Sequence, residues 1–253
     1  MNKRINIFPR LEIETQSTCN RTCPTCIRNS IPDRESVSSW FEKNQLPIET
    51  IEKIFVESTK IGFRGEVCLS HYNEPLMDER IIEIAKMARK FQFSRVFMCS
   101  NGDFLTENLA NELDNLMDDI GFTLYMNEPT RSKRDMWIRT LFKRSKIKIA
   151  HYTDGEHDRM ITHNSPLVDA SSLAKKFSNN PCHHPQKRMI INHRGQMLLC
   201  CDDLVGNFDL GSIHESSIEE LWYSEKHQDH VISLMNYGGR KINQHCLTCP
   251  RQS

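Results

Sequence analysis

Three cysteines lie within eight positions near the start of the chain: Cys19, Cys23 and Cys26. Thiolates at this density bind zinc or an iron–sulfur cluster. Three thiolates on a cubane 4Fe–4S cluster leave one iron without a protein ligand, and an open coordination position is typical of a reactive metal site. Zinc with a distant histidine or cysteine as its fourth ligand is the alternative.

A second group of cysteines lies near the end of the chain: Cys182, Cys200, Cys246 and Cys249. Four thiolates make a closed site, which an iron–sulfur cluster or a structural zinc ion can occupy. Cys68, Cys99 and Cys201 are left over. The first two lie in apolar runs, where a cysteine is usually a small buried hydrophobe.

Composition and charge limit the class of protein. The 253 residues include 33 Lys and Arg against 33 Asp and Glu, and 38% are hydrophobic. This balance is that of a globular enzyme and disfavours a nucleic-acid binder. No signal peptide or membrane span is apparent, so a cytoplasmic protein is expected, with cysteines that bind metal and form no disulfides.

Strand-like and helix-like segments alternate through the first 150 residues. We expect strands at 11–15, 67–70, 95–100, 122–126 and 146–150, and amphipathic helices near 48–55, 81–88 and 105–116. Thr106 is a plausible cap for the third helix. After the first strand, strands recur every ~25–30 residues, which predicts an α/β fold with a partial (β/α)5-6 TIM-like barrel. Cys19 follows the first strand, at the mouth where barrel enzymes do chemistry.

The pattern changes after Cys182. Residues 189–201 read as two strands joined by a turn at Arg194-Gly195, and 217–235 as one amphipathic helix capped by Ser216 or Ser217. We therefore expect two domains, a partial barrel at 1–168 and a small α+β unit of hairpin and helix at 169–253.

The C-x3-C-x2-C pattern after "LEIETQS" resembles the radical S-adenosylmethionine (SAM) superfamily. "HYNEP" (71–75) resembles that family's G-G-E-P segment, which holds the methionine ammonium, and "CSNGDFL" (99–105) resembles its T-N-G segment near the ribose. The resemblance implies that the cluster binds SAM and cleaves it to a 5′-deoxyadenosyl radical. Expected cofactor contacts are Tyr72, Asn73, Glu74, Ser100 and Asn101. Tyr72 and Asn73 replace the usual glycines, and Thr25 stands where many members carry an aromatic residue.

The second cysteine group resembles the twitch domain, a shortened SPASM domain that carries one auxiliary 4Fe–4S cluster. Its spacing is C-x12-G-x4-C followed by C-x2-C, around Gly195. This implies that Cys182, Cys200, Cys246 and Cys249 are the ligands and that Cys201 is not. Two 4Fe–4S clusters are therefore expected.

Nearly the whole chain resembles the twitch-bearing dehydrogenases that oxidise 2-deoxy-scyllo-inosamine in aminoglycoside biosynthesis. The resemblance implies oxidation of a small-molecule alcohol, with the auxiliary cluster as electron acceptor and a flavodoxin or ferredoxin as electron donor. Related proteins often carry an Asn-Arg-Gly-like stretch before the auxiliary domain, and the corresponding "THNSP" (162–166) lacks that arginine, so the base of those dehydrogenases has no counterpart here. Candidate bases in mouth-facing loops are Arg159, His163, His151 and Arg131.

Two other readings stay open. One is modification of a peptide or a nucleotide, such as crosslinking or epimerisation, in which Cys201 or Cys99 could donate a hydrogen atom. No peptide-binding leader domain is apparent, which disfavours a peptide substrate. The other is a non-catalytic electron carrier or zinc-stapled binding protein, which predicts four protein ligands at both sites.

Overall fold

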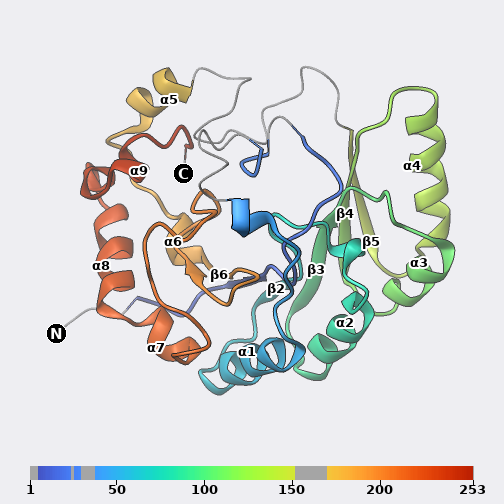
Figure 1. Ribbon diagram of the computed structural model, residues 1–253, viewed down its shortest axis with the longest axis horizontal. Helices are drawn as coiled ribbons and strands as arrows, with labels where there is room; N and C mark the ends of the chain where they lie inside the picture. Colours follow the sequence, from blue (N-terminus) through green and yellow to red (C-terminus); the bar gives the residue numbers. More distant parts are fainter. Residues whose placement is uncertain (1–4, 24–25, 30–37, 152–169, 253) are drawn as a thin grey trace.

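The computed structural model describes residues 5–23, 26–29, 38–151 and 170–252. Within these residues one sheet has the strand order β5-β4-β3-β2-β1-β6-β7 (Figure 1). All neighbouring strands are parallel except β6 and β7, which are antiparallel. The strands are β1 Arg10–Ile13, β2 Glu66–Cys68, β3 Arg95–Ser100, β4 Asp119–Leu124, β5 Lys146–His151, β6 Arg188–Ile191 and β7 Met197–Leu198.

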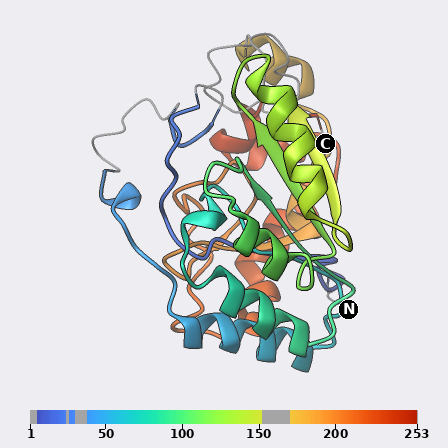
Figure 2. The ribbon, with the colours of Figure 1, turned by 90° about the vertical axis from the view of Figure 1, so that its right-hand side faces the viewer.

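Helices α1 to α4 lie on the outer side of the curved sheet, and α5 to α9 lie on the side of the sheet where β6 and β7 form its edge (Figures 1 and 2). The α-helices are α1 Ile48–Lys60, α2 Ile81–Lys90, α3 Glu107–Leu113, α4 Thr130–Leu141, α5 Ala170–Phe177, α6 His184–Lys187, α7 Ile218–Trp222, α8 Glu225–Leu234 and α9 Gln244–Leu247. Three 3-10 helices complete this set: η1 Ser38–Phe41, η2 Pro75–Met77 and η3 Gly239–Ile242. None of the helices in the described ranges is long and apolar enough to cross a membrane.

Alternation along the strands separates an apolar face from a charged one. Leu11 and Ile13 are fully buried in the hydrophobic core with residues of the outer helices. The alternate positions carry charges that pair across strands: Arg10 lies 2.6 Å from Glu66, and Arg95 lies 3.0 Å from Glu66. The inner face of the sheet is therefore polar, as a cavity for a polar ligand requires.

The α/β fold with a partial barrel is confirmed, and so are the five predicted barrel strands and the cap at Thr106, which accepts from the Leu109 N–H. The predicted hairpin also forms, with Gly195 at φ 76° in its turn, a conformation that favours glycine. Its first strand, β6, pairs in parallel with β1. The two units expected on either side of residue 168 thus share one sheet.

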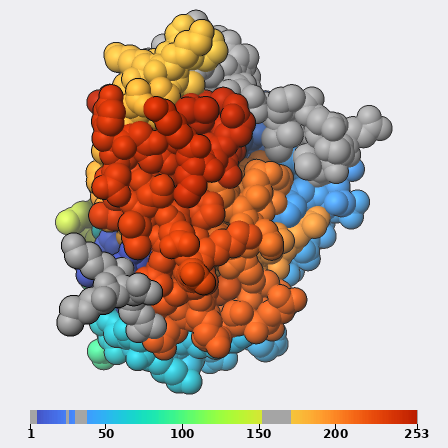
Figure 3. Space-filling view, turned by 90° about the vertical axis from the view of Figure 1, so that its left-hand side faces the viewer, coloured from blue at the N-terminus to red at the C-terminus, as the bar shows by residue number. Residues whose placement is uncertain are grey.

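The prediction of a single helix at 217–235 is wrong. The segment forms two helices, α7 and α8, because Ser217 caps the first with a capping box and Ser224 caps the second. Trp222, at the end of α7, is fully buried, and its Nε1 donates to the Asn6 carbonyl at 3.0 Å. The C-terminal elements are thereby held against the start of the barrel, and they cover one side of the molecule (Figure 3).

Candidate active site

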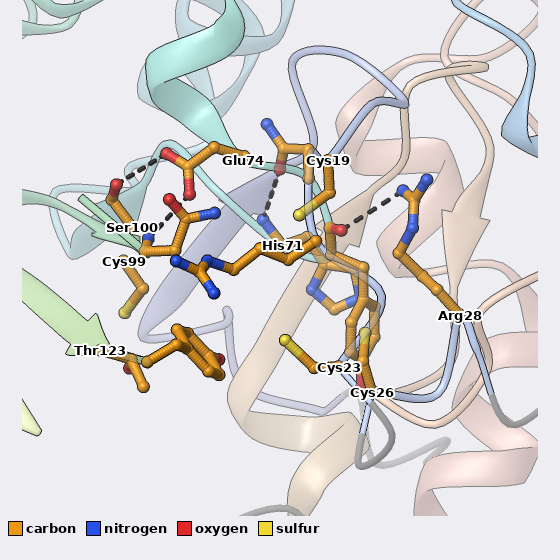
Figure 4. A pocket seen from close by; sticks show the side chains of 14 residues that line it. Cys19, Cys23, Cys26, Arg28, His71, Glu74, Cys99, Ser100 and Thr123 are labelled. Atoms are coloured by element: carbon orange, nitrogen blue, oxygen red, sulfur yellow. Dashed lines mark hydrogen bonds between the residues drawn. The ribbon is translucent and has the colours of Figure 1, made fainter. Parts of the chain in front are cut away.

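The three front cysteines occupy the loop that leaves β1 at the mouth of the barrel. Backbone hydrogen bonds from Cys26 N to Cys23 O (3.0 Å) and from Asn29 N to Cys26 O (2.8 Å) form consecutive turns. These turns bring Cys23 and Cys26 to the same cavity as Cys19, as predicted from their spacing (Figure 4). The other described residues that line this cavity are Arg21, Arg28, His71, Tyr72, Asn73, Glu74, Cys99, Ser100, Asn101, Thr123 and Tyr125.

The donor set fits an iron–sulfur cluster. Burial raises the pKa of Cys19, and it raises the pKa of Cys26 to about 11. Buried thiols of this kind become thiolates when a metal supplies the compensating positive charge. Arg28 lies beside Cys26 and donates to the Tyr72 carbonyl at 3.3 Å, which joins the cluster loop to the segment after β2.

Glu74 connects the two segments, 71–75 and 99–105, that the family resemblance assigns to SAM binding. One carboxylate oxygen accepts from Leu76 N at 3.0 Å and from the Ser100 hydroxyl at 2.6 Å, and the other accepts from Asn101 N at 2.7 Å. Figure 4 shows Glu74 and Ser100 joined by their hydrogen bond at the cavity wall. Burial raises the pKa of Glu74 despite these hydrogen bonds. The second oxygen keeps acceptor capacity, so the carboxylate could bind a positively charged group of a ligand as well.

Asn73 provides an unsatisfied polar group in the same cavity. Its side chain accepts from His71 N at 3.0 Å, while its buried Nδ2 has no hydrogen-bond partner in the described part of the chain. A buried donor without a partner costs about 1–3 kcal/mol unless a ligand satisfies it. The cavity therefore fits a ligand with acceptor oxygens, such as the carboxylate of methionine.

Sequence reasoning missed a polar cage that joins the cluster loop to the segment after β3. Arg21 donates to both carboxylate oxygens of Asp103, at 2.7 and 2.6 Å, and Asn20 donates to Asp103 at 2.7 Å. Asn101 donates to the Asn20 side chain at 2.8 Å, and the Arg21 guanidinium lies 4.6 Å from the centre of the Tyr125 ring. The only available signal in the sequence was that Asn20 and Arg21 directly follow Cys19, because their partners come from distant segments.

Tyr72 lines the cavity and also reaches the C-terminal part of the chain. Its hydroxyl donates to the Cys201 carbonyl at 2.6 Å. Burial raises the pKa of Tyr72 well above its usual value, so the phenol stays protonated and remains a donor. The side chain that replaces a family glycine thus bonds the loop that carries Cys200.

The four C-terminal cysteines come together from three segments. Burial, and to a smaller extent the nearby Cys182, raises the pKa of Cys246 to about 12. Burial, and to a smaller extent the nearby Asp202, raises the pKa of Cys249 to about 12 as well. Burial also raises the pKa of Cys200, whose thiol interacts with Cys249. Cys246 is buried and the other three are partly buried. Four thiols in one region suit a closed metal site, although no three ligating side chains of the described residues are grouped as a metal site in this structure.

Of the four predicted bases, the structure describes two, His151 and Arg131, and both lie away from the cavity. Arg159 and His163 lie outside the described residues, as does Thr25. His151 is on the edge strand β5, where its Nε2 lies 2.9 Å from Asp135, and Arg131 pairs with Glu128 at 3.0 Å. Neither lines the cavity.

A partial barrel with three thiols at its mouth and four more in its C-terminal part is the arrangement expected of an iron–sulfur enzyme. The sequence pattern of the radical SAM superfamily matches residues 13–153, and that of the SPASM iron–sulfur cluster-binding domain matches residues 182–250. The chain belongs to the radical SAM superfamily. Its cofactors are therefore SAM and iron–sulfur clusters, one of them in the C-terminal region, as expected from the sequence.

Individual relatives agree in fold over nearly the whole chain. The SAM-dependent 2-deoxy-scyllo-inosamine dehydrogenase of Niallia circulans is 24% identical over 244 residues, which cover 96% of this chain and 93% of the relative. The structure of BtrN with AdoMet and 2-DOIA superposes with a TM-score of 0.77 at 21% identity, covering 98% and 95% of the two chains. That of anSMEcpe with AdoMet and a peptide gives 0.59 at 12% identity, covering 95% and 87%.

Proposed function

We propose that this protein is a radical SAM dehydrogenase that oxidises one hydroxyl group of a small aminocyclitol or sugar-like alcohol to a ketone. The observation that carries the proposal is the three-thiol cavity at the barrel mouth, which the Tyr72–Cys201 hydrogen bond joins to the loop that carries Cys200. The dehydrogenase relative spans almost the same length.

Cys19, Cys23 and Cys26 would hold the first cluster, and Glu74 and Asn73 would hold the methionine end of SAM. Ser100 and Asn101 keep Glu74 in place. When bound, these cofactors supply a 5′-deoxyadenosyl radical that removes a hydrogen atom from a substrate carbon. Cys182, Cys200, Cys246 and Cys249 would hold the auxiliary cluster that accepts the second electron.

The polar inner face favours a small polar substrate. The buried Glu12 and the partly buried Arg188 and Arg10 form an ionic group on β1 and β6, with Arg188 3.2 Å from Glu12. Such a surface suits a ligand with several hydroxyl or amino groups. Electrons for the first cluster would come from a flavodoxin or ferredoxin.

The test is anaerobic reconstitution followed by incubation with SAM, dithionite and 2-deoxy-scyllo-inosamine. We expect about eight irons per chain, four per cubane, together with 5′-deoxyadenosine and a ketone product. The Cys19→Ala/Cys23→Ala/Cys26→Ala variant should form neither product. The Cys246→Ala/Cys249→Ala variant should still cleave SAM but form no ketone.

Zinc in place of iron, with no SAM cleavage, would refute the enzyme proposal. SAM cleavage without any ketone from the wild-type protein would show a radical enzyme with another substrate. The two results therefore separate the class of enzyme from its substrate.

A further inference from the structure

A buried carboxylate–imidazole pair faces the cavity. Glu12 on β1 and His71 directly after β2 have side chains only 7% and 4% exposed, and His71 Nδ1 lies 3.3 Å from Glu12 Oε2. His71 lines the cavity together with the three front cysteines (Figure 4). Neither residue was a sequence candidate for the base.

Charges around Glu12 favour its ionised form. Burial opposes ionisation of Glu12, but the hydrogen bond with His71 and the charges of His71, Arg188 and Arg10 lower its pKa overall. An ionised carboxylate can only accept a hydrogen bond, so His71 donates to it from Nδ1. With Nδ1 engaged in this way, Nε2 is the ring nitrogen left to accept a proton.

Nε2 is available for a proton. It is buried and has no hydrogen-bond partner among the described residues. The other titratable groups of the cavity wall are less suited. Burial raises the pKa of Cys99 and of Tyr125, which keeps both protonated, and Glu74 already accepts three hydrogen bonds.

We propose that His71, oriented by Glu12, is the base that accepts the hydroxyl proton of the substrate; this rests on the proposed dehydrogenase function. The substrate loses its carbinol hydrogen atom to the 5′-deoxyadenosyl radical, its hydroxyl proton to His71 Nε2, and one electron to the auxiliary 4Fe–4S cluster. The C–O single bond becomes a C=O bond, and the two hydrogens and two electrons of the oxidation are accounted for.

The position of His71 suits this order of events. Its ring packs edge-on against Tyr72, with 4.5 Å between ring centres, and Tyr72 bonds the loop of Cys200 and Cys201. The proposed base thus packs on the residue that bonds the loop of Cys200, the loop expected to hold the electron acceptor.

The test uses reconstituted His71→Gln enzyme and 2-deoxy-scyllo-inosamine deuterated at the carbon that is oxidised. We expect deuterium transfer to 5′-deoxyadenosine to continue, while ketone formation falls by about 100-fold, within the usual contribution of a general base. A carbon-centred substrate radical should accumulate in electron paramagnetic resonance spectra. Equilibrium dialysis should show unchanged substrate binding.

Two further variants serve as comparisons. Glu12→Gln removes the charge that orients His71 and should lower ketone formation by about 10- to 100-fold with the same deuterium transfer. His230→Gln, on the outer helix α8, is the matched control and should behave as wild type. Iron content shows whether each variant has assembled both clusters.

Two results would overturn the role of His71. One is a wild-type ratio of ketone to 5′-deoxyadenosine in His71→Gln. The other is loss of deuterium transfer together with weaker substrate binding, which would make His71 a binding residue. A wild-type enzyme that forms no ketone contradicts the proposed function itself, and the role of His71 in it, so the two failures are distinguishable.

Discussion

Asp103 offers a direct test of the cage that holds the cluster loop. Its carboxylate accepts two hydrogen bonds from Arg21 and one from Asn20, and these three are the side-chain contacts that join the two loops through Asp103. Asp103→Asn removes the charge and replaces one acceptor oxygen with an amide donor. That donor must face a donor of Arg21 or Asn20, so at least one hydrogen bond is lost.

The magnitude follows from the type and exposure of these contacts. A hydrogen bond to a charged group contributes about 1.5–3 kcal/mol. Side chains of Arg21 and Asp103 are 28% and 22% exposed, so solvent screening reduces the expected loss to about 1–2 kcal/mol. Because 1.4 kcal/mol corresponds to a factor of ten, SAM affinity should fall by about 5- to 30-fold if the loop must be ordered to bind it.

The assay is equilibrium binding of SAM to anaerobically reconstituted enzyme, with iron content measured in parallel. Asp209→Asn is the matched control because Asp209 has a side chain 92% exposed, and its positive φ of 47° is tolerated by asparagine. It should bind SAM as wild type does. An Asp103→Asn enzyme with full iron content and SAM affinity within about twofold of wild type would refute the role of the cage.

Three further predictions concern the contact between barrel and C-terminal region and the stability of the fold. Tyr72→Phe removes the hydrogen bond to Cys201 and should lower the free energy of unfolding by about 1 kcal/mol in urea denaturation; an unchanged value would mean that the bond contributes nothing. Trp222→Ala removes a fully buried side chain that packs 4.9 Å from the Phe8 ring, and should cost about 3–5 kcal/mol in the same assay. Burial lowers the pKa of His227 to about 4, so the unfolded chain binds the extra proton between pH 6.5 and 4. As the pH is lowered through that window, the free energy of unfolding should decrease by up to about 1.4 kcal/mol per pH unit from this group. The His227→Gln variant should show a shallower dependence on pH.

The fold was predictable from local patterns, and so was the placement of Cys19, Cys23 and Cys26 at one cavity. Leu11 and Ile13 alternate with charged residues, which predicts a strand with one apolar face, and the following cysteine spacing predicts a cluster loop at the strand end. The helix break at Ser224 was missed because the whole segment was interpreted as one amphipathic helix. Its signal was a second serine suited to cap a helix.

The contacts of the site were less predictable because they join segments far apart in the sequence. Asp103 looked like an ordinary turn residue after Asn-Gly, and only the folded chain brings it to Arg21. His71 was read as part of a SAM-binding segment. Its pairing with Glu12 depends on the parallel register of β1 and β2, in which Glu12 lies opposite Cys68. Sequence patterns indicate strands but not their registers.

The pairing of β6 with β1 explains how two distant cysteine groups serve one site. Glu12 lies opposite Ile190 in parallel register, so β6 ends at the same barrel mouth as β1. The hairpin that follows leads to Cys200 and Cys201, where the Tyr72 hydroxyl bonds the Cys201 carbonyl. The front cysteines and the loop of Cys200 are therefore linked at one end of the sheet by the Tyr72 side chain. That arrangement suits a reaction in which a hydrogen atom leaves toward one cofactor and an electron toward the other.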